Sequence, residues 1–153
     1  MRESIGGAWL LGIVMTFIVL FASFLAISIN YSKAFKVKNN VVDLIEKNEG
    51  MTNQTVDDIY GYLRSQGYIL KGRCSGGYKG FDMGGESTNP NESLYCVKKE
   101  KVNDTALNKA YYSVEVFFRL DLPIFGDIFT FKVSGETMSI YFAEDDFWPE
   151  TGV

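Results

Sequence analysis

The residue types that most often carry catalysis are scarce in this chain. It has two cysteines and no histidine among its 153 residues. Histidine is the commonest general base, and both Ser-His-Asp and Cys-His arrangements depend on it. Two cysteines without histidine also fall short of a standard zinc site. We therefore expect no catalytic residue, metal, cofactor or small-molecule substrate, and an enzyme with an unrecognised site ranks last among the functions considered.

The two cysteines can instead form a structural bond. Cys74 and Cys96 lie 22 residues apart, around a segment, residues 72–92, that holds six glycines. This placement indicates a disulfide in an oxidising compartment, which would stabilise a small domain by about 3 kcal/mol. The alternative is two unconnected thiols in the core. Because the glycine spacing matches no phosphate-binding motif, residues 75–92 are predicted to be a mobile hairpin loop pinned at its base.

The densest acidic run lies near the C-terminus, at Glu144, Asp145 and Asp146. Three carboxylates can bind a divalent cation, but these lack the alternating spacing of an EF-hand loop. A solvated tail is the expected state. The neighbouring Phe147 and Trp148 are expected to pack on the edge of the domain, with contact to a partner or to lipid headgroups as the alternative.

The longest apolar stretch lies at the N-terminus. No charged side chain occurs between Glu3 and Lys33. As a helix, residues 5–29 would extend roughly 37 Å, and about 20 residues suffice to cross the hydrocarbon core. The apolar region of a signal peptide is shorter and ends in a small-x-small cleavage site; only Ala26-Ile27-Ser28 resembles one. We predict a retained transmembrane anchor over residues 1–30.

Beyond the anchor, a helical stalk is predicted for residues 31–50. Apolar residues recur there at steps of three and four, which places them on one face that must pack against the chain's own sheet or a partner helix. Within the anchor, small residues four apart would allow another helix to approach closely, although such pairs also arise by chance. The predicted helix-packing residues are therefore Ala8, Gly12, Ala22, Ala26, Val37, Val41 and Leu44.

Residues 51–153 are predicted to form a small α+β domain. A second helix, capped by Asn53 or Thr55, should end at Gly67, followed by a short strand at residues 68–70. Residues 94–99, 111–121 and 128–142 have strand patterns, with a bulge predicted at Gly135. The expected fold class is α+β: a long transmembrane helix extending into a stalk, a second short helix, and an antiparallel sheet of three or four strands.

The charge is divided unevenly between the two parts of the chain. Residues 1–38 have four basic side chains and one acidic one, whereas residues 39–153 have 11 basic and 18 acidic ones, for a total of −4. An acidic domain repels nucleic acid. The three lysines that follow the anchor, Lys33, Lys36 and Lys38, favour a cytoplasmic domain by the positive-inside rule, whereas a disulfide favours an extracytoplasmic one.

Three features of the sequence resemble the TadE-like minor pilins, or pseudopilins, of Tad/Flp pilus and related type II/IV secretion systems. The first is Glu3 ahead of a long apolar helix that continues into a charged stalk. The second is the paired-cysteine segment after a helix and Gly67-Tyr68-Ile69-Leu70. The third is the stretch VFFRLDLPIFGDIFTFKVSGETMSIY at residues 116–141. The resemblance covers the chain loosely and implies a pilin-like fold, a structural subunit of an envelope-spanning filament or its assembly complex, and an extracytoplasmic domain.

Two functions therefore compete. The first is a membrane-anchored, pilin-like structural or accessory subunit that acts by assembly with other pilin-like or secretion-system subunits. The alternative is a membrane-anchored extracellular binding or sensory domain, with the glycine-rich residues 75–92 as its variable face. In both, the lipid bilayer is a partner and the domain lies outside the cytoplasm.

Overall fold

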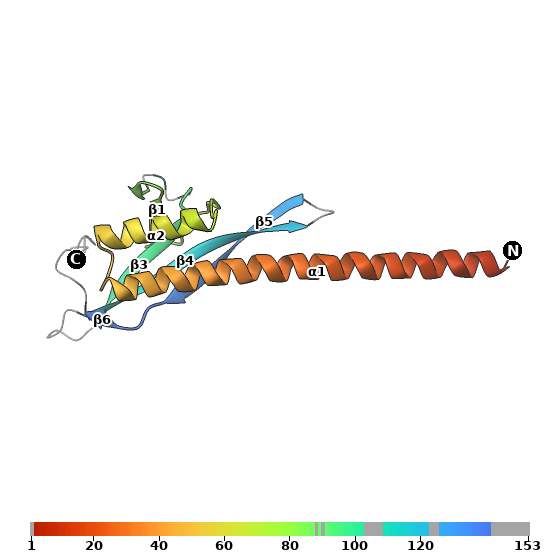
Figure 1. Ribbon diagram of the computed structural model, residues 1–153, viewed down its shortest axis with the longest axis horizontal. Helices are drawn as coiled ribbons and strands as arrows, with labels where there is room; N and C mark the ends of the chain where they lie inside the picture. The colour runs from red at the N-terminus through yellow and green to blue at the C-terminus, as the bar shows by residue number, and fades with distance from the viewer. Residues whose placement is uncertain (1, 88, 90, 103–108, 123–125, 142–153) are drawn as a thin grey trace.

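The computed structural model describes the backbone of all residues except 1, 88, 90, 103–108, 123–125 and 142–153, and the side chains of these and of residues 2–5, 119–122 and 126–129 are likewise not described. The described chain has two helices and six strands (Figure 1). They are α1 (Arg2–Lys47), α2 (Asn53–Ser65), β1 (Lys79–Asp82), β2 (Gly85–Glu86), β3 (Tyr95–Lys101), β4 (Lys109–Leu122), β5 (Gly126–Glu136) and β6 (Ile140–Tyr141). The α+β class with a long N-terminal helix is thus confirmed. The predicted acidic run and the Phe147–Trp148 pair lie outside the described residues.

Helix α1 is unbroken over 46 residues and projects far beyond the rest of the molecule (Figure 1). It contains no proline, so no backbone donor is missing from its interior. It ends in a Schellman arrangement, in which Gly50 N–H donates to the Ile45 carbonyl at 2.9 Å. The left-handed residue of this cap is Glu49, with φ 54°, although glycine is the usual residue there.

Helix α2 begins at Asn53, so its N-cap lies one residue before the first cap predicted from the sequence. Thr52 is the N-cap, and its side chain accepts a hydrogen bond from Thr55 N–H at 3.2 Å. Thr55 is the third helical residue and completes a capping box. At the other end, Gly67 has φ 62°, and Tyr68 N–H donates to the Leu63 carbonyl at 2.9 Å. The prediction of a glycine cap at residue 67 is therefore confirmed.

The strands form one antiparallel sheet with the order β2-β1-β3-β4-β5, and β6 pairs with β4. Six strands exceed the three or four predicted, because β1 and β2 lie within the glycine-rich segment and the strand predicted at residues 128–142 is divided into β5 and β6. A Cβ at Gly80 would lie 1.9 Å from Ser93 Oγ, so glycine is what allows β1 to pack there. The strand predicted at residues 68–70 is absent; this stretch is irregular backbone, followed by an isolated bridge from Gly72 to Ser93.

The bulge predicted at Gly135 is wrong. Gly135 pairs in regular register with Val114, and the irregularity falls between Leu120 and Asp121. The glycine has a different role, because a Cβ there would lie 2.3 Å from the Lys38 side chain. Gly135 thus leaves room for α1 to cross the sheet.

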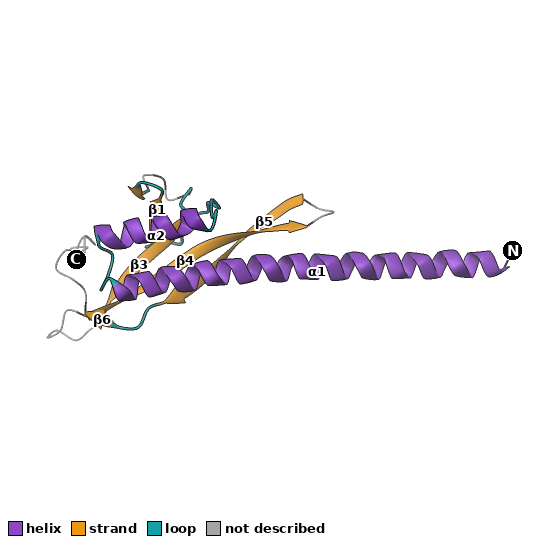
Figure 2. Ribbon diagram, in the orientation of Figure 1, coloured by secondary structure: helices purple, strands orange, loops and turns teal. Residues whose placement is uncertain are grey.

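Both helices contribute to one core on one face of the sheet (Figure 2). The second half of α1 supplies Ala34, Val37, Val41 and Ile45, and α2 supplies Ile59 and Leu63. The predicted alternation of β4 is seen in this core, since the sheet contributes Tyr112, Val114 and Val116. The polar residues on its other face, Ser113 and Glu115, are nevertheless buried, because residues 71–78 cross that face.

Candidate functional site: the bare helix and the membrane-facing end of the domain

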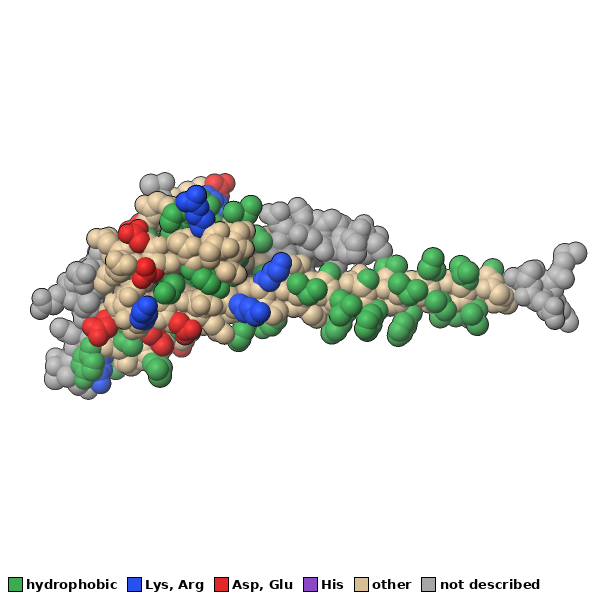
Figure 3. Space-filling model, viewed as in Figure 1, with side chains coloured by type: hydrophobic (Ala, Val, Ile, Leu, Met, Phe, Trp, Pro, Cys, Tyr) green, Lys and Arg blue, Asp and Glu red, His purple; other side chains and the backbone are tan. Residues whose placement is uncertain are grey.

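The N-terminal half of α1 has no packing partner within the described chain. None of residues 6–29 is buried, and the helix that contains them is long and apolar enough to cross a membrane. Figure 3 shows hydrophobic side chains along the visible face of this part of the helix and basic side chains where it meets the domain, and no charged side chain occurs on any face between Glu3 and Lys33. An apolar surface on every side of a helix is typical of a membrane span. A single-pass membrane helix is thus consistent with the structure.

Two polar side chains of this segment are satisfied by the helix itself. Thr16 Oγ1 donates to the Gly12 carbonyl at 2.9 Å, and Ser23 Oγ donates to the Val19 carbonyl at 2.8 Å. Lipid offers no hydrogen-bond partner, so polar groups in a span must be paired within the protein. These two hydroxyl groups therefore do not oppose burial in lipid.

The predicted helix-packing residues divide into two groups. Val37 and Val41 are buried against the chain's own sheet and α2, and Leu44 is half-buried against the same core. The sequence allowed either the chain's own sheet or a partner helix to cover the apolar face of the stalk, and the structure shows that the sheet covers it. Ala8, Gly12 and Ala22 are exposed and Ala26 is half-buried. A Cβ on Gly12 would meet nothing within 4 Å, so this face is free to receive another helix.

The predicted disulfide is present. Cys74 and Cys96 are bonded, with their Cα atoms 5.7 Å apart, and Cys96 lies in β3 as expected. The bond ties residues 71–78 to the sheet face that lies opposite the helices. A Cβ on Gly72 would lie 2.3 Å from the Phe117 ring, which shows how closely the backbone passes over that ring.

Polar contacts also hold residues 71–78 to the sheet at the residue after the disulfide. Ser75 N–H donates to Glu115 Oε2 at 3.0 Å, and Lys132 Nζ donates to Ser75 Oγ at 2.5 Å. Lys132 Nζ also lies 3.8 Å from Glu115 Oε2. The start of the predicted mobile loop is therefore held at the disulfide and at Ser75, and the following residues form β1 and β2.

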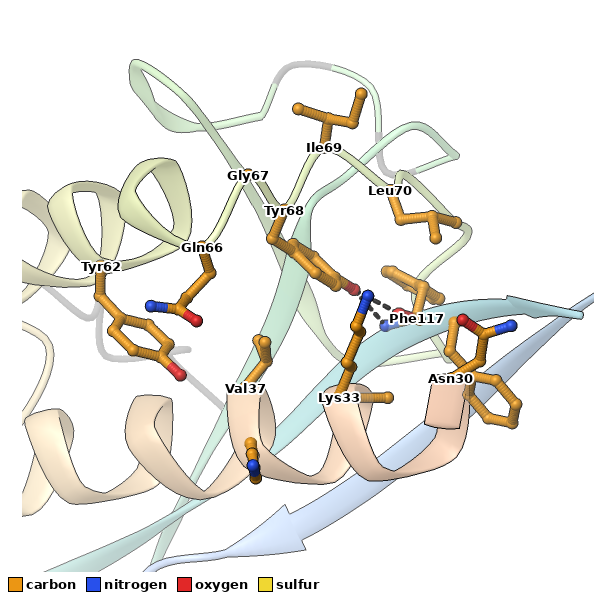
Figure 4. Close-up of a pocket in the computed structure, with 13 residues that line it drawn as sticks. Asn30, Lys33, Val37, Tyr62, Gln66, Gly67, Tyr68, Ile69, Leu70 and Phe117 are labelled. Carbon is orange, nitrogen blue, oxygen red and sulfur yellow. Dashed lines mark hydrogen bonds between the residues drawn. The ribbon is translucent and has the colours of Figure 1, made fainter. Parts of the chain in front are cut away.

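A cavity of about 450 Å³ lies where α1, the end of α2 and β4 meet (Figure 4). It lies at the end of the domain from which the apolar part of α1 projects. It combines cationic, amide, hydroxyl and apolar groups. The lining residues are Asn30, Lys33, Ala34, Lys36, Val37, Tyr62, Gln66, Gly67, Tyr68, Ile69, Leu70, Phe117 and Phe118.

Tyr68 forms a rigid wall of this cavity. Its hydroxyl donates to the Phe117 carbonyl and accepts from Phe117 N–H at 2.8 Å, so it joins the α2–β1 connection to β4. Burial raises the pKa of Tyr68 to about 12, against the opposing effect of the hydrogen bond to the Phe117 backbone. The hydroxyl therefore stays protonated over the physiological pH range.

The cationic side of the cavity comes from α1. Lys33 and Lys36 are exposed, and neither forms a salt bridge with any described acidic residue. Figure 4 shows the Lys33 side chain directed into the cavity, toward the Tyr68 hydroxyl. No Asp or Glu is among the lining residues. The cavity is thus positively charged and has no internal counter-ion.

Aromatic side chains continue the cavity wall outward. Tyr31 packs edge-on against Phe118 with ring centroids 5.9 Å apart, and Phe118 stacks on Phe131 at 5.3 Å. Phe35 stacks on Tyr31 at 6.3 Å. The β4–β5 hairpin that supplies two of these rings runs along α1 toward its bare half (Figure 1). Tyrosine and tryptophan are enriched at both surfaces of membranes, and the position of Tyr31, directly after the apolar run, fits this preference.

The described part of the chain offers no group of three or more histidine, cysteine, aspartate or glutamate side chains that could hold a metal ion. The acidic run at residues 144–146 lies outside it.

The cavity could not be predicted from the sequence, because the lysines after the apolar run indicate only orientation and residues 68–70 have a strand pattern. The available signal was the position of Lys33 and Lys36 directly after the span.

Comparison with known protein families, with curated proteins and with solved structures found no match to this chain. The fold and the site therefore define its class by themselves. It is an α+β protein with a single N-terminal helix that is long and apolar enough to span a membrane, and with a disulfide-bonded domain packed on the far half of that helix.

Proposed function

We propose that this chain is a membrane-anchored, pilin-like structural or accessory subunit of a Tad-type pilus or secretion system, and that it acts by protein–protein assembly. The observation that carries the proposal is the continuity of α1. One unbroken helix has a bare apolar half and a half whose Val37 and Val41 belong to the domain core. A subunit built this way transmits any displacement of its membrane helix directly to its domain.

The bare half is also suited to helix–helix contact. Association of helices in lipid relies on close van der Waals packing, which small residues permit. Ala8 and Gly12 lie one turn apart on an exposed face. The proposal assigns this face to a neighbouring subunit and leaves the remaining faces to lipid.

The proposal places the domain outside the cytoplasm. The support for this orientation is the Cys74–Cys96 disulfide, because such bonds persist in oxidising compartments and are rare in the cytosol. The lysines after the span favour the opposite orientation by count. Labelling of intact cells with a membrane-impermeant lysine reagent decides between them, since the exposed Lys47 reacts only if the domain is outside.

Site-specific photocrosslinking in the cells that make the protein tests the assembly. A photoreactive residue at Gly12 reports on the small-residue face, and one at Leu10 reports on a face about 200° around the helix. We expect adducts with copies of the chain or with other membrane proteins at position 12, several-fold more abundant than at position 10. Recovery of only the monomer at both positions would contradict assembly through this face.

A second candidate function is a membrane-anchored extracellular binding or sensory domain. The observation that favours it is the cavity of about 450 Å³ beside α1, not the glycine-rich segment, whose first part is tied to the sheet. A monomeric protein that crosslinks to no neighbour would favour this second function.

A further inference from the structure

The cavity lies at a defined depth relative to the bilayer. The apolar run ends at Ile29, and Lys33 and Lys36 follow it by four and seven residues. At about 1.5 Å per residue these positions are roughly 6 and 10 Å beyond the run. The polar headgroup region of a bilayer is about 5–8 Å thick on each side. Lys33 thus lies at headgroup level, and the long side chain of Lys36 can reach back to it.

Several large apolar side chains near the cavity are exposed, where contact with water is unfavourable for them. Ile69, at its rim, is 73% exposed, and Tyr31, Phe35 and Phe131 are 50%, 42% and 41% exposed. These side chains come from α1, from the connection after α2 and from β5. Tyr31 and Phe131 contact the cavity-lining Phe118. The four side chains thus form an apolar rim, hereafter the rim, that continues the bare surface of α1 toward the domain. A surface of this kind suits the boundary between headgroups and acyl chains.

The interior of the cavity has the chemistry that recognises a phosphate. Lys33 and Lys36 supply two ammonium groups, and Asn30 and Gln66 supply amide donors. The C-terminal end of α2 points here, and the negative end of a helix dipole disfavours an anion. Its last carbonyls are occupied, however, because Gln66 N–H donates to the Tyr62 carbonyl and Gly67 N–H to the Arg64 carbonyl, both at 3.1 Å.

We propose that the cavity between α1, the end of α2 and β4 binds the phosphate-bearing headgroup of an anionic phospholipid. Lys33 and Lys36 pair with the phosphate, the amides of Asn30 and Gln66 donate to its oxygens or to the headgroup hydroxyls, and Leu70 and Phe118 pack on the glycerol and the upper acyl chain. The bound lipid fixes the height of the domain above the bilayer. This inference concerns a different surface from the small-residue face and does not depend on assembly.

Native mass spectrometry of the full-length protein in detergent tests the proposal. The probes are phosphatidylglycerol, phosphatidylcholine and glycerol 1-phosphate, each titrated separately. We expect one phosphatidylglycerol molecule to be retained at least tenfold more tightly than phosphatidylcholine. The K33Q/K36Q variant should lose about 30-fold in affinity for phosphatidylglycerol, since each lysine near an anionic lipid surface contributes a factor of about five to binding.

The matched control removes two positive charges away from the cavity. Lys47 and Arg73 are exposed and do not line it, so K47Q/R73Q should bind phosphatidylglycerol as the wild type does. The K33R/K36R variant keeps the charge and should retain most of the binding. All three variants alter exposed side chains, and near-UV circular dichroism verifies that the domain is folded.

Three outcomes would overturn the proposal. Equal loss in K33Q/K36Q and K47Q/R73Q would show general attraction by surface charge. Retention of phosphatidylcholine and phosphatidylglycerol with the same affinity would remove the role of the anionic headgroup. Binding of glycerol 1-phosphate as tight as that of the lipid would identify a soluble phosphate ester as the ligand. Each of these results leaves the crosslinking test of assembly unaffected.

Discussion

The two halves of α1 differ in composition and in what they contact. Residues 6–29 are apolar on every side and none is buried by the described chain. From residue 34 onward, the buried positions form a single stripe, Ala34, Val37, Val41 and Ile45, while the charged side chains lie on the other faces. The difference teaches that an apolar stripe lets one face of a helix pack on a domain, whereas an apolar surface on every side leaves no face suited to water.

The matched substitutions V41D and V14D should separate the two halves most strongly. Val41 is 0% exposed and Val14 is 48% exposed. An unpaired carboxylate in the core should lower the free energy of unfolding of the domain by about 4 kcal/mol or more. V14D should leave the domain intact and reduce membrane insertion by about 3 kcal/mol.

Guanidinium unfolding in detergent, followed by near-UV circular dichroism, measures the first effect, and membrane fractionation after expression measures the second. If V14D also unfolded the domain, the two halves would not be independent, and the comparison would fail.

Removal of the disulfide should affect only the domain half. The bond closes a loop of 22 residues, and loops of this length lose about 3 kcal/mol of stability without their crosslink. We expect the C74S/C96S variant to unfold at a lower guanidinium concentration and its residues 71–78 to become sensitive to protease. Its partition into membranes should not change, and a change would show that the bond also supports α1.

Tyr68 lies beside the point where the two halves of α1 meet. The Y68F substitution should lower the free energy of unfolding by about 1–2 kcal/mol, because the Phe117 N–H and carbonyl lose their hydrogen-bond partner. The control is Y95F. The Tyr95 hydroxyl is buried without a hydrogen-bond partner among the described atoms, so its removal should leave the stability unchanged or slightly raised. Equal destabilisation by both variants would contradict this assignment.

The same tyrosine predicts a pH dependence. Its pKa is raised from 10.0 to about 12 in the folded state, so the unfolded chain ionises first as the pH increases. The stabilisation due to Tyr68 is fully present below about pH 10 and is lost between about pH 10 and 12. The difference in unfolding free energy between wild type and Y68F should therefore shrink over this interval, as measured by unfolding at successive pH values.

The smallest expected effect lies at the membrane-distal end of α1. Glu49 has φ 54°, a conformation that glycine adopts without strain. E49G should stabilise the domain by about 0.5–1 kcal/mol, whereas G50A, at φ 128°, should destabilise it by more than that. Thermal unfolding of both variants would detect the opposite signs, and destabilisation by E49G would indicate that its side chain has a structural role.

Local patterns were sufficient for most of the helical structure and for the disulfide. The long apolar run, the stripe at Val37 and Val41, and the glycine cap at residue 67 are all short-range signals, and each is confirmed. Short-range signals failed for the first strand of the sheet. Gly80 has no strand propensity, yet β1 passes through it, because only glycine fits beside Ser93.

Only part of the candidate site could be predicted from the sequence, again because the patterns used are short-range. The exposed small residues of α1 and the two cysteines could be identified from spacing alone. The cavity could not, because Lys33, Gln66 and Phe117 come from three elements far apart in the sequence. The burial of Glu115 was likewise unpredictable, since it depends on residues 71–78 crossing the sheet face that the alternation assigned to solvent.

The sequence by itself determined a helix long and apolar enough to span a membrane, an α+β domain after it, and the pairing of Cys74 with Cys96, since composition, periodicity and a single cysteine pair leave few alternatives. The tertiary structure alone decided that the stalk packs on its own sheet, and that two lysines, a half-buried tyrosine and an apolar rim surround one cavity where the apolar half of α1 meets the domain. The physical reason is that periodicity specifies which face of an element is apolar, whereas only the folded arrangement specifies what meets that face.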